Sequence, residues 1–437
     1  MTTRTLLAAE KAPPGRAQFR RSGDDLWAEW PDYLVRMRFS ELSEEKGGYH
    51  SNYAIFVDLP NAPSPADWGQ MNLSASQTRS GVAKRLEEQW SGPVCPPYRD
   101  MLSEAAGWVV EQYREGEPLK VIGDKRPVTP TRYALWPIMP LNELTVMFAD
   151  GGSGKSMLAI AWVMAMQQNQ QLLGLMPGAK NLRALYLDWE THDYEQHNRF
   201  WRVANGFGLE DPKPILYREC YRPLHRDIAN IRRMVEDNDV NVVVIDSIGA
   251  AVGGDPIDAA ANIGMVGAIR SLRVTTLAVD HVNKTESNGK PFGSVYKFNY
   301  ARAAWELKKA VSGDENQINI ALLHRKANNG RLQSAMGFRL DFDGDDGPVT
   351  ITRQEVADMP ELAVHLPLTE RIRGIIRRNH FNNEQIVEAI QEFTPESKRD
   401  TINRLISRLR QSGEVEAIAG GLRWTGKPDK PRTGVRV

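Results

Sequence analysis

Apolar and polar residues alternate in blocks between residues 132 and 355, and the blocks predict strands and helices in turn. Short runs rich in Val, Ile and Leu have the length of buried strands, and longer helical segments separate the early runs. The predicted strands are Leu144–Phe148, Ala184–Leu187, Ile215–Arg218, Val240–Ile245, Thr275–Val279, Ala304–Lys308, Ile318–Leu323, Gly337–Phe342 and Val349–Thr352. We therefore expect an α/β core with a mainly parallel sheet, helices on both faces and an antiparallel extension at its end.

Residues 23–120 have a different pattern, which predicts a small α+β module. Tyr33–Phe39 alternates as a half-buried strand does, and Tyr53–Val57 is a second strand candidate. Helices are expected at Ser80–Trp90 and Tyr98–Tyr113. We recognise no chemistry in this module. Residues 1–22 are predicted to be a flexible leader, and residues 115–131, rich in Pro, Gly and Lys, a linker.

Residues 366–425 predict three helices followed by a hairpin, the arrangement of a winged helix-turn-helix. The first two helices are expected at Leu368–Asn379 and Asn383–Phe393. The third is expected to begin at Thr394 as its cap, with Pro395 in the first turn. Two short strands around Gly420 then form the hairpin. The tail, residues 426–437, is basic and rich in Pro.

The composition is that of an ordinary globular protein. The 437 residues suffice for two or three domains, and the formal net charge is zero, which neither favours nor excludes nucleic acid. The two cysteines, Cys95 and Cys220, have no neighbours at metal-binding spacing and are expected to be reduced. No apolar run has membrane-spanning length, and the N-terminus does not have the form of a secretory signal. We therefore expect a cytoplasmic protein without a membrane partner.

The segment Ala149–Met157 has the form of a phosphate-binding P-loop. It follows a predicted strand and opens a predicted helix at Gly154-Lys155-Ser156. Glycines allow backbone N–H groups to surround phosphate, and the helix N-terminus adds positive potential. Ala149 stands where the pattern has glycine. The predicted ATP-binding residues are Asp150, Gly151, Gly152, Ser153, Gly154, Lys155, Ser156 and Met157; Lys155 is expected on the β- and γ-phosphates and Ser156 on Mg²⁺.

Two acidic residues at predicted strand ends are candidates for metal binding and catalysis. Asp246 ends a hydrophobic strand, as the Walker B aspartate that orders Mg²⁺ does. It is followed by Ser247 and not by an acid, so the general base must come from elsewhere. Glu190, beyond the strand that follows the P-loop helix, is the favoured base. Asp188 is the alternative, and it is also suited to cap the following helix.

His281 and the segment after it are candidates for sensing and transmitting the state of the nucleotide. His281 ends a strand and is a candidate γ-phosphate sensor, although a lone histidine is more often structural. Residues 284–300 alternate lysines with aromatic residues, which suits single-stranded nucleic acid; the alternative is a solvated loop with its rings in the core. The predicted DNA contacts here are Lys284, Lys290, Lys297 and Arg302.

A basic cluster after the strand Ile318–Leu323 is a candidate for catalysis in trans. Arg325, Lys326 or Arg331 would neutralise transition-state charge at a neighbouring subunit's nucleotide, so that hydrolysis requires assembly. The alternative is a basic hairpin turn without a catalytic role.

Together these motifs resemble the RecA-fold ATPase core, and most closely the RepA/DnaB-like branch of hexameric helicases of plasmids and phages. The resemblance covers residues 132–355. It implies Glu190 as catalytic base, His281 at the sensor position, and a homo-oligomer in the form of a hexameric ring, with ATP between subunits. Relatives often carry paired Lys-x-Arg cations, whereas Lys326 is followed by Ala327 and Asn328.

The third predicted C-terminal helix carries basic residues opposite its apolar face. Arg404 and Arg408 are one turn apart, with Arg399 nearby, and these three are the predicted DNA contacts of a recognition helix. A winged helix that docks a protein is the alternative. We expect an ATPase that acts on DNA as a replicative helicase. A recombination mediator, annealing protein or helicase loader, and an ATP-switched DNA-binding regulator, are the alternatives.

Overall fold

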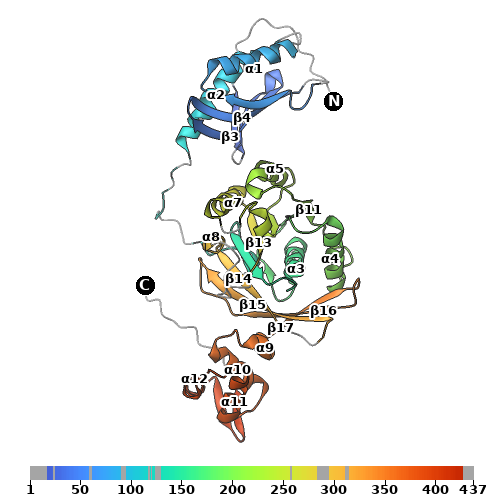
Figure 1. Cartoon of the computed structure of the whole chain (residues 1–437), viewed down its shortest axis with the longest axis vertical. Helices are drawn as coiled ribbons and strands as arrows, with labels where there is room; N and C mark the ends of the chain where they lie inside the picture. Colours follow the sequence, from blue (N-terminus) through green and yellow to red (C-terminus); the bar gives the residue numbers. More distant parts are fainter. Residues whose placement is uncertain are drawn as a thin grey trace. The chain divides into compact units, whose positions relative to one another are not determined.

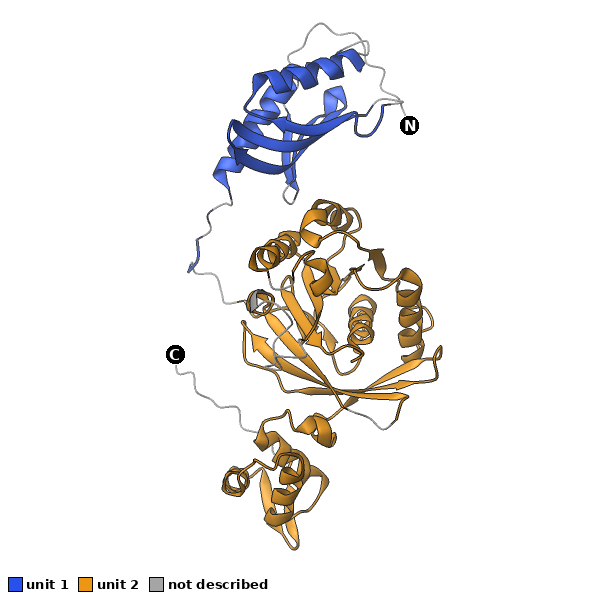
Figure 2. Cartoon of the chain, viewed as in Figure 1, with its two compact units in different colours: residues 1–128 blue, residues 129–437 orange. Residues whose placement is uncertain are grey.

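The computed structural model describes residues 17–22, 25–58, 62–89, 95–116, 119, 121–123, 129–255, 258–282, 295–310 and 314–426. The chain divides into two compact units, Met1–Val128 and Thr129–Val437 (Figure 2). Most of the predicted leader, parts of the predicted linker, the segment with Lys284 and Lys290, and the basic tail beyond residue 426 lie outside the described residues. In the described part of the chain, no helix combines the length and apolarity that crossing a bilayer requires.

The first unit is a five-stranded antiparallel sheet in which each strand pairs with the next along the chain. Alternate strand residues face helices α1 and α2 and form one core with them. Its elements are β1 (Gln18–Ser22), β2 (Asp25–Trp30), β3 (Val35–Glu45), β4 (Gly48–Val57), β5 (Asp67–Asn72), α1 (Ser76–Gln89) and α2 (Tyr98–Glu115). The prediction that residues 18–22 belong to a leader is wrong, because they pair with β2 as an edge strand.

The second unit is built on a nine-stranded sheet with the order β11-β10-β12-β13-β8-β14-β15-β16-β17. Pairing is parallel from β11 to β14 and antiparallel beyond it. The strands are β8 (Leu144–Ala149), β10 (Ala184–Asp188), β11 (Leu216–Glu219), β12 (Val242–Asp246), β13 (Thr275–His281), β14 (Ala303–Lys309), β15 (Gln317–Ala327), β16 (Met336–Phe342) and β17 (Val349–Gln354). The predicted α/β fold class with a mainly parallel sheet and an antiparallel extension is confirmed.

Helices cover both faces of the parallel part of this sheet (Figure 1). One core contains residues of α3 (Lys155–Gln168) and α4 (Asp193–Gly206), and the other contains residues of α5 (Leu224–Asp237) and α7 (Ala259–Leu272). Successive residues of β8 alternate between the two cores, as the pleat requires. Short helices α6 (Ile248–Ala251) and α8 (Val295–Tyr300) and a small sheet of β6 (Tyr133–Trp136), β7 (Met139–Pro140) and β9 (Met176–Pro177) complete this part.

Three helices and a two-stranded hairpin follow the large sheet and share a core of their own. They are α10 (Leu368–Arg378), α11 (Asn383–Phe393), α12 (Arg399–Gln411), β18 (Val415–Ile418) and β19 (Gly421–Trp424), preceded by η2 (Val356–Asp358) and α9 (Pro360–Ala363). The expectation that Thr394 begins the third helix is wrong: its backbone N–H bonds to Ile390 at the end of α11, and α12 begins after Lys398. The Thr394 hydroxyl does not cap α12 and instead accepts a hydrogen bond from Arg371.

Candidate active site

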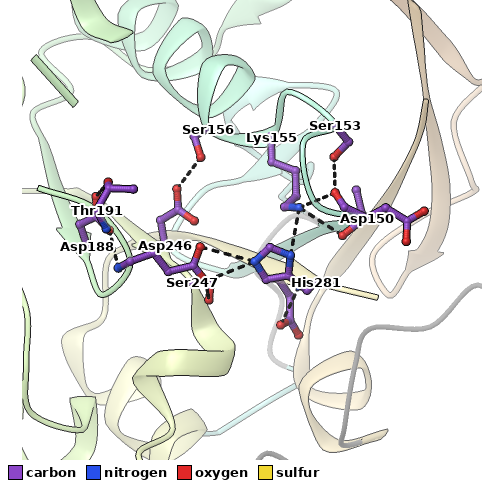
Figure 3. A network of polar contacts seen from close by, with 12 residues as sticks. Asp150, Ser153, Lys155, Ser156, Asp188, Thr191, Asp246, Ser247 and His281 are labelled. Carbon is purple, nitrogen blue, oxygen red and sulfur yellow. Dashed lines mark hydrogen bonds and ion pairs between the residues drawn. The ribbon is translucent and has the colours of Figure 1, made fainter. Parts of the chain in front are cut away.

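The glycine-rich segment after β8 forms a tight turn that leads into α3 (Figure 3). Gly152 and Gly154 have φ angles of 64° and 83°, in the left-handed region where a residue with a Cβ is strained. The hydroxyl of Ser153 donates to the carbonyl of Asp150 across the turn, at 2.7 Å. Ala149 is still part of β8, without a left-handed φ, so alanine is tolerated where the motif has glycine.

Lys155 is the first residue of α3, and its amine lies back over the turn. Its Nζ donates to the carbonyls of Ala149 and Asp150, at 3.1 and 2.9 Å. The side chain is buried, and burial lowers the pKa of Lys155, against the attraction of Asp246. A cation beside the free N–H groups of a helix N-terminus is suited to bind a polyanion such as a triphosphate.

Asp246 ends β12, and its carboxylate faces the first turn of α3. Its Oδ2 accepts hydrogen bonds from the hydroxyls of Ser156 and Tyr186, at 2.8 and 2.5 Å. Burial raises the pKa of Asp246, and these two hydrogen bonds oppose that change. Carboxylate and hydroxyl oxygens are the donors that Mg²⁺ takes, so Ser156 and Asp246 fit the metal that the sequence predicts here.

Glu190 lies in the turn after β10, and Asp188 organises that turn. Asp188 is buried and accepts hydrogen bonds from the backbone N–H groups of Glu190 and Thr191, at 2.8 and 3.0 Å. The Glu190 carboxylate is 37% exposed and accepts a hydrogen bond from Ser247. The geometry therefore gives Asp188 a structural role and leaves Glu190 as the accessible carboxylate.

His281 ends β13, and its ring lies close to the amine of Lys155 (Figure 3). Its Nε2 is 3.2 Å from Oε1 of Glu190, and its Nδ1 is 3.4 Å from Nζ of Lys155. The hydrogen bond with His281 lowers the pKa of Glu190, and burial opposes it. Glu190 is thus held as a carboxylate, the form that a general base needs. Three residues remote in sequence therefore meet at the carboxyl edge of the parallel sheet.

Lys297 belongs to α8 and is buried, so the expectation that it contacts DNA does not hold. Its exposed fraction is 0%, and its Nζ donates to Oδ2 of Asp280 at 3.2 Å. Asp280 is 1% exposed and accepts a second hydrogen bond from the backbone N–H of His281, at 2.9 Å. A buried lysine cannot reach a phosphate without leaving its partner charge uncompensated. Lys284 and Lys290 lie outside the described residues.

The sequence suggested that Arg325 and Lys326 follow the strand, at its tip. The structure instead places both residues within β15. The strand extends beyond the predicted apolar run because its residues continue to pair with β14. Arg325 forms an ion pair with the buried Glu306 at 2.6 Å. Lys326 donates to the carbonyl of Phe298 at 2.8 Å. Both cations therefore hold β14, β15 and α8 together within one chain.

The five other predicted basic residues that the structure describes are on the surface. Arg302, just before β14, is 3.4 Å from Glu143 and 45% exposed. Arg404 and Arg408 are exposed on α12, opposite its buried apolar face, and neither forms an ion pair with another described residue. Arg399 at the start of α12 is exposed and pairs with Glu384. Arg331 is exposed in the connection after β15.

Tyr186 and Ser247 contribute to the site but were missed by the sequence analysis. Tyr186 shares a face of β10 with Asp188 at two-residue spacing, which is a usable signal for a side chain near the strand end. Ser247 stands where an acid often follows the Walker B aspartate, and its hydroxyl donates to Glu190, the residue that replaces that acid. Met157 is half-buried and packs against the core behind α3.

A family model matches the part of the chain that carries this site. Residues 111–287, fewer than half of the chain, match the AAA domain family. Among solved structures, a KaiC-like protein from Pyrococcus horikoshii OT3 is 14% identical, with a TM-score of 0.38, over 53% of this chain and 99% of that one. The flagellar accessory protein FlaH from Methanocaldococcus jannaschii is 13% identical, with a TM-score of 0.35, over 50% and 91%. No curated protein matches.

The second unit therefore contains a P-loop ATPase core that is similar, over the matched residues, to the AAA domain family. The family match extends across the glycine-rich turn, Glu190, Asp246 and His281. The strand order, with β8 between β13 and β14, brings these residues to one edge of the sheet. The two solved structures are too distant to add to this assignment.

Proposed function

We propose that the chain is an ATP-hydrolysing motor that acts on DNA, of the replicative helicase type found in plasmids and phages. The observation that carries the proposal is the contact of His281 with both Lys155 and Glu190, at 3.4 and 3.2 Å. This contact joins the phosphate-binding lysine, the candidate base and the strand that leads into residues 283–294. Hydrolysis at the first two is thereby linked to the segment that we propose as the strand-binding element.

The chemistry follows from the positions of the side chains. The turn at 149–156 and Lys155 would bind the triphosphate of ATP. Ser156 and Asp246 would hold Mg²⁺, which neutralises charge on the phosphates. Glu190, oriented by Ser247, would take a proton from the attacking water. His281 would respond to the γ-phosphate, because its Nδ1 already lies beside the lysine that binds it.

We also propose that cations of a neighbouring subunit complete the site in a hexameric ring. Arg331 is the better candidate for this role, because it is exposed, whereas Arg325 is paired with buried Glu306 and Lys326 with backbone carbonyls. An exposed guanidinium reaches a partner without breaking contacts in its own chain. Replacement of Arg331 by alanine should abolish hydrolysis in assembled protein, and mixing with Lys155→Ala subunits should restore part of it.

The C-terminal helices and hairpin are proposed to bind duplex DNA as a winged helix. Arg404 and Arg408 are exposed at one-turn spacing on α12 and are not engaged in ion pairs with other described residues. Removal of phosphate contacts of this kind lowers the salt dependence of DNA binding. We expect the double substitution to alanine to weaken DNA binding and to reduce the slope against salt by about two. A slope equal to that of the unaltered protein would contradict the proposal.

Unwinding of forked DNA tests the motor directly. ATP-dependent strand separation that is lost in Lys155→Ala is the expected result. DNA-stimulated hydrolysis without unwinding would contradict the helicase role and favour a mediator, annealing protein or loader. A sequence-specific footprint that persists in Lys155→Ala would favour an ATP-switched regulator.

A further inference from the structure

A cavity of about 550 Å³ lies beside α4, and none of its lining residues belongs to the glycine-rich turn. Its walls come from one residue of α3, the strands β10 and β11, helix α4 and the connection between α4 and β11. The aromatic lining consists of Tyr186, Tyr194, His197, Phe200, Trp201 and Tyr217. Cavities of about 300–1,000 Å³ with mainly apolar and aromatic walls are the usual form of small-ligand sites.

The lining specifies the class of ligand. Ring faces and ring edges are both present: Tyr186 and Tyr217 are tilted by 34° at 6.4 Å, and Phe200 and Trp201 are perpendicular at 5.6 Å. Such walls accept a flat ring by stacking and edge contacts. Among the described residues that line the cavity, Asp193 is the only acid, and none is a lysine or arginine. A phosphate or carboxylate would lose its hydration without gaining a cation.

Two residues that line the cavity also form hydrogen bonds with residues of the candidate active site. The ring of Tyr186 lines the cavity, and its hydroxyl donates to Asp246, the proposed metal carboxylate. Gln196 also lines the cavity, and its Nε2 donates to Oδ2 of Asp188 at 2.7 Å. Asp188 in turn accepts the backbone N–H of Glu190. A movement of Tyr186 or Gln196 would therefore be transmitted to Asp246, the proposed metal ligand, or to the turn that carries Glu190, the candidate base.

Tyr217 makes a third contact of the same kind. Its ring lines the cavity, and its hydroxyl donates to the carbonyl of Thr191 at 3.1 Å. Thr191 belongs to the turn that carries Glu190, and its backbone N–H is bound by Asp188. The turn is thus held from the cavity side by two wall residues, Tyr217 and Gln196.

We propose that this cavity binds a planar aromatic ligand without negative charge, of purine or indole size, and that its occupancy changes ATP hydrolysis through Tyr186 and the turn at Asp188. Binding itself does not depend on the proposed DNA-acting role. The effect on hydrolysis rests on the proposed nucleotide site. By linkage, a ligand that alters the affinity for nucleotide has its own affinity altered by nucleotide to the same factor.

Indole and adenosine are suitable probes, titrated against the full chain by calorimetry and saturation-transfer NMR. We expect at least one to bind with a Kd of about 1 mM or below. Tighter binding of indole would identify a ligand like an amino-acid side chain, and tighter binding of adenosine a nucleobase. Measurement in Lys155→Ala separates the cavity from the P-loop: binding should persist there although hydrolysis is lost.

Two variants and one control test the location. Trp201→Ala, at a 39% exposed position, should weaken binding about fivefold or more. Ile215→Trp should fill the cavity and abolish binding. Tyr221→Ala, at an 82% exposed aromatic outside the lining, should leave binding unchanged. The proposal is overturned if neither probe binds, or if Ile215→Trp binds as the unaltered chain does.

The coupling has its own readout. Saturating probe should shift the affinity for nucleotide about fivefold, in either direction, as allosteric sites commonly do. An unchanged nucleotide affinity and an unchanged rate with the probe bound would refute the link through Tyr186 and Asp188, while the binding site would stand.

Discussion

Glutamine in place of Glu190 removes one negative charge from the site and alters its shape very little. Oε1 of Glu190 accepts the hydroxyl of Ser247 and lies 3.2 Å from Nε2 of His281. A glutamine carbonyl at the Oε1 position retains the acceptor for both the Ser247 hydroxyl and the Nε2–H of His281. The backbone bond to Asp188 is unaffected. What is lost is the basic carboxylate that would receive the proton of the attacking water.

The expected magnitude follows from the role of a general base. Positioned bases contribute about 10²–10⁴-fold to the rate, which corresponds to about 3–5 kcal/mol of activation free energy. Affinity for ATP should hardly change, because Lys155, Ser156 and Asp246 keep their contacts. The carboxylate also carries a pKa lowered by the hydrogen bond with His281. Activity that depends on Glu190 should therefore persist through neutral pH and fall only in acid.

Steady-state phosphate release and calorimetric titration of magnesium nucleotide separate the two effects. Glu195→Gln is a matched control: Glu195 is in the first turn of α4 and pairs with Arg199, outside the network around Glu190. It should retain turnover within about twofold. Unchanged turnover in Glu190→Gln would refute the assignment of the base, and loss of turnover together with loss of binding would indicate a structural role.

Three further outcomes follow from the buried contacts. Tyr186→Phe removes a hydrogen bond to Asp246, so the half-saturating Mg²⁺ concentration of hydrolysis should change several-fold; an unchanged value would argue against a metal at Asp246. Lys297→Met leaves Asp280 uncompensated and should lower the free energy of unfolding by about 3–5 kcal/mol, measured by urea denaturation; a loss of DNA affinity without destabilisation would restore a role in DNA binding. Burial raises the pKa of Asp280 from 3.8 to about 6. In the unfolded chain Asp280 ionises at a lower pH than in the folded chain. Its contribution to the free energy of unfolding is therefore complete below about pH 4 and falls by about 3 kcal/mol as the pH rises through 6. Asp280→Asn should remove that dependence from the urea midpoints.

The sequence was sufficient where the signal was local. The strand before the glycine-rich turn, the turn itself and α3 are adjacent along the chain, so their apolar run, glycines and lysine predict both the conformation and its chemistry. The same holds for the strand ends that carry Glu190, Asp246 and His281. Parallel strands bring their carboxyl ends to one edge, so the grouping of these residues follows once the strands are identified.

The predictions failed where a residue's role depends on contacts remote in sequence. Lys297 lies in a run of lysines and aromatic residues that favours a nucleic-acid loop. In the structure it is buried, and its amine donates a hydrogen bond to Asp280 of β13. Thr394 has the composition of a helix cap, but Arg371, from α10, occupies its hydroxyl. Local composition cannot express which of two competing hydrogen-bond partners is closer in the folded chain.

The residues around Glu190 show this division most clearly. A motif located Glu190 and left Asp188 as a rival, because both are acids near one strand end. The fold distinguishes the two acids. Asp188 is buried and accepts hydrogen bonds from backbone N–H groups, whereas Glu190 accepts a hydrogen bond from Ser247, the residue after β12. Residue types and short-range order are properties of the chain, whereas the pairing of side chains depends on strand order. Strand order is set by packing of the whole sheet between its helices, which no single segment encodes.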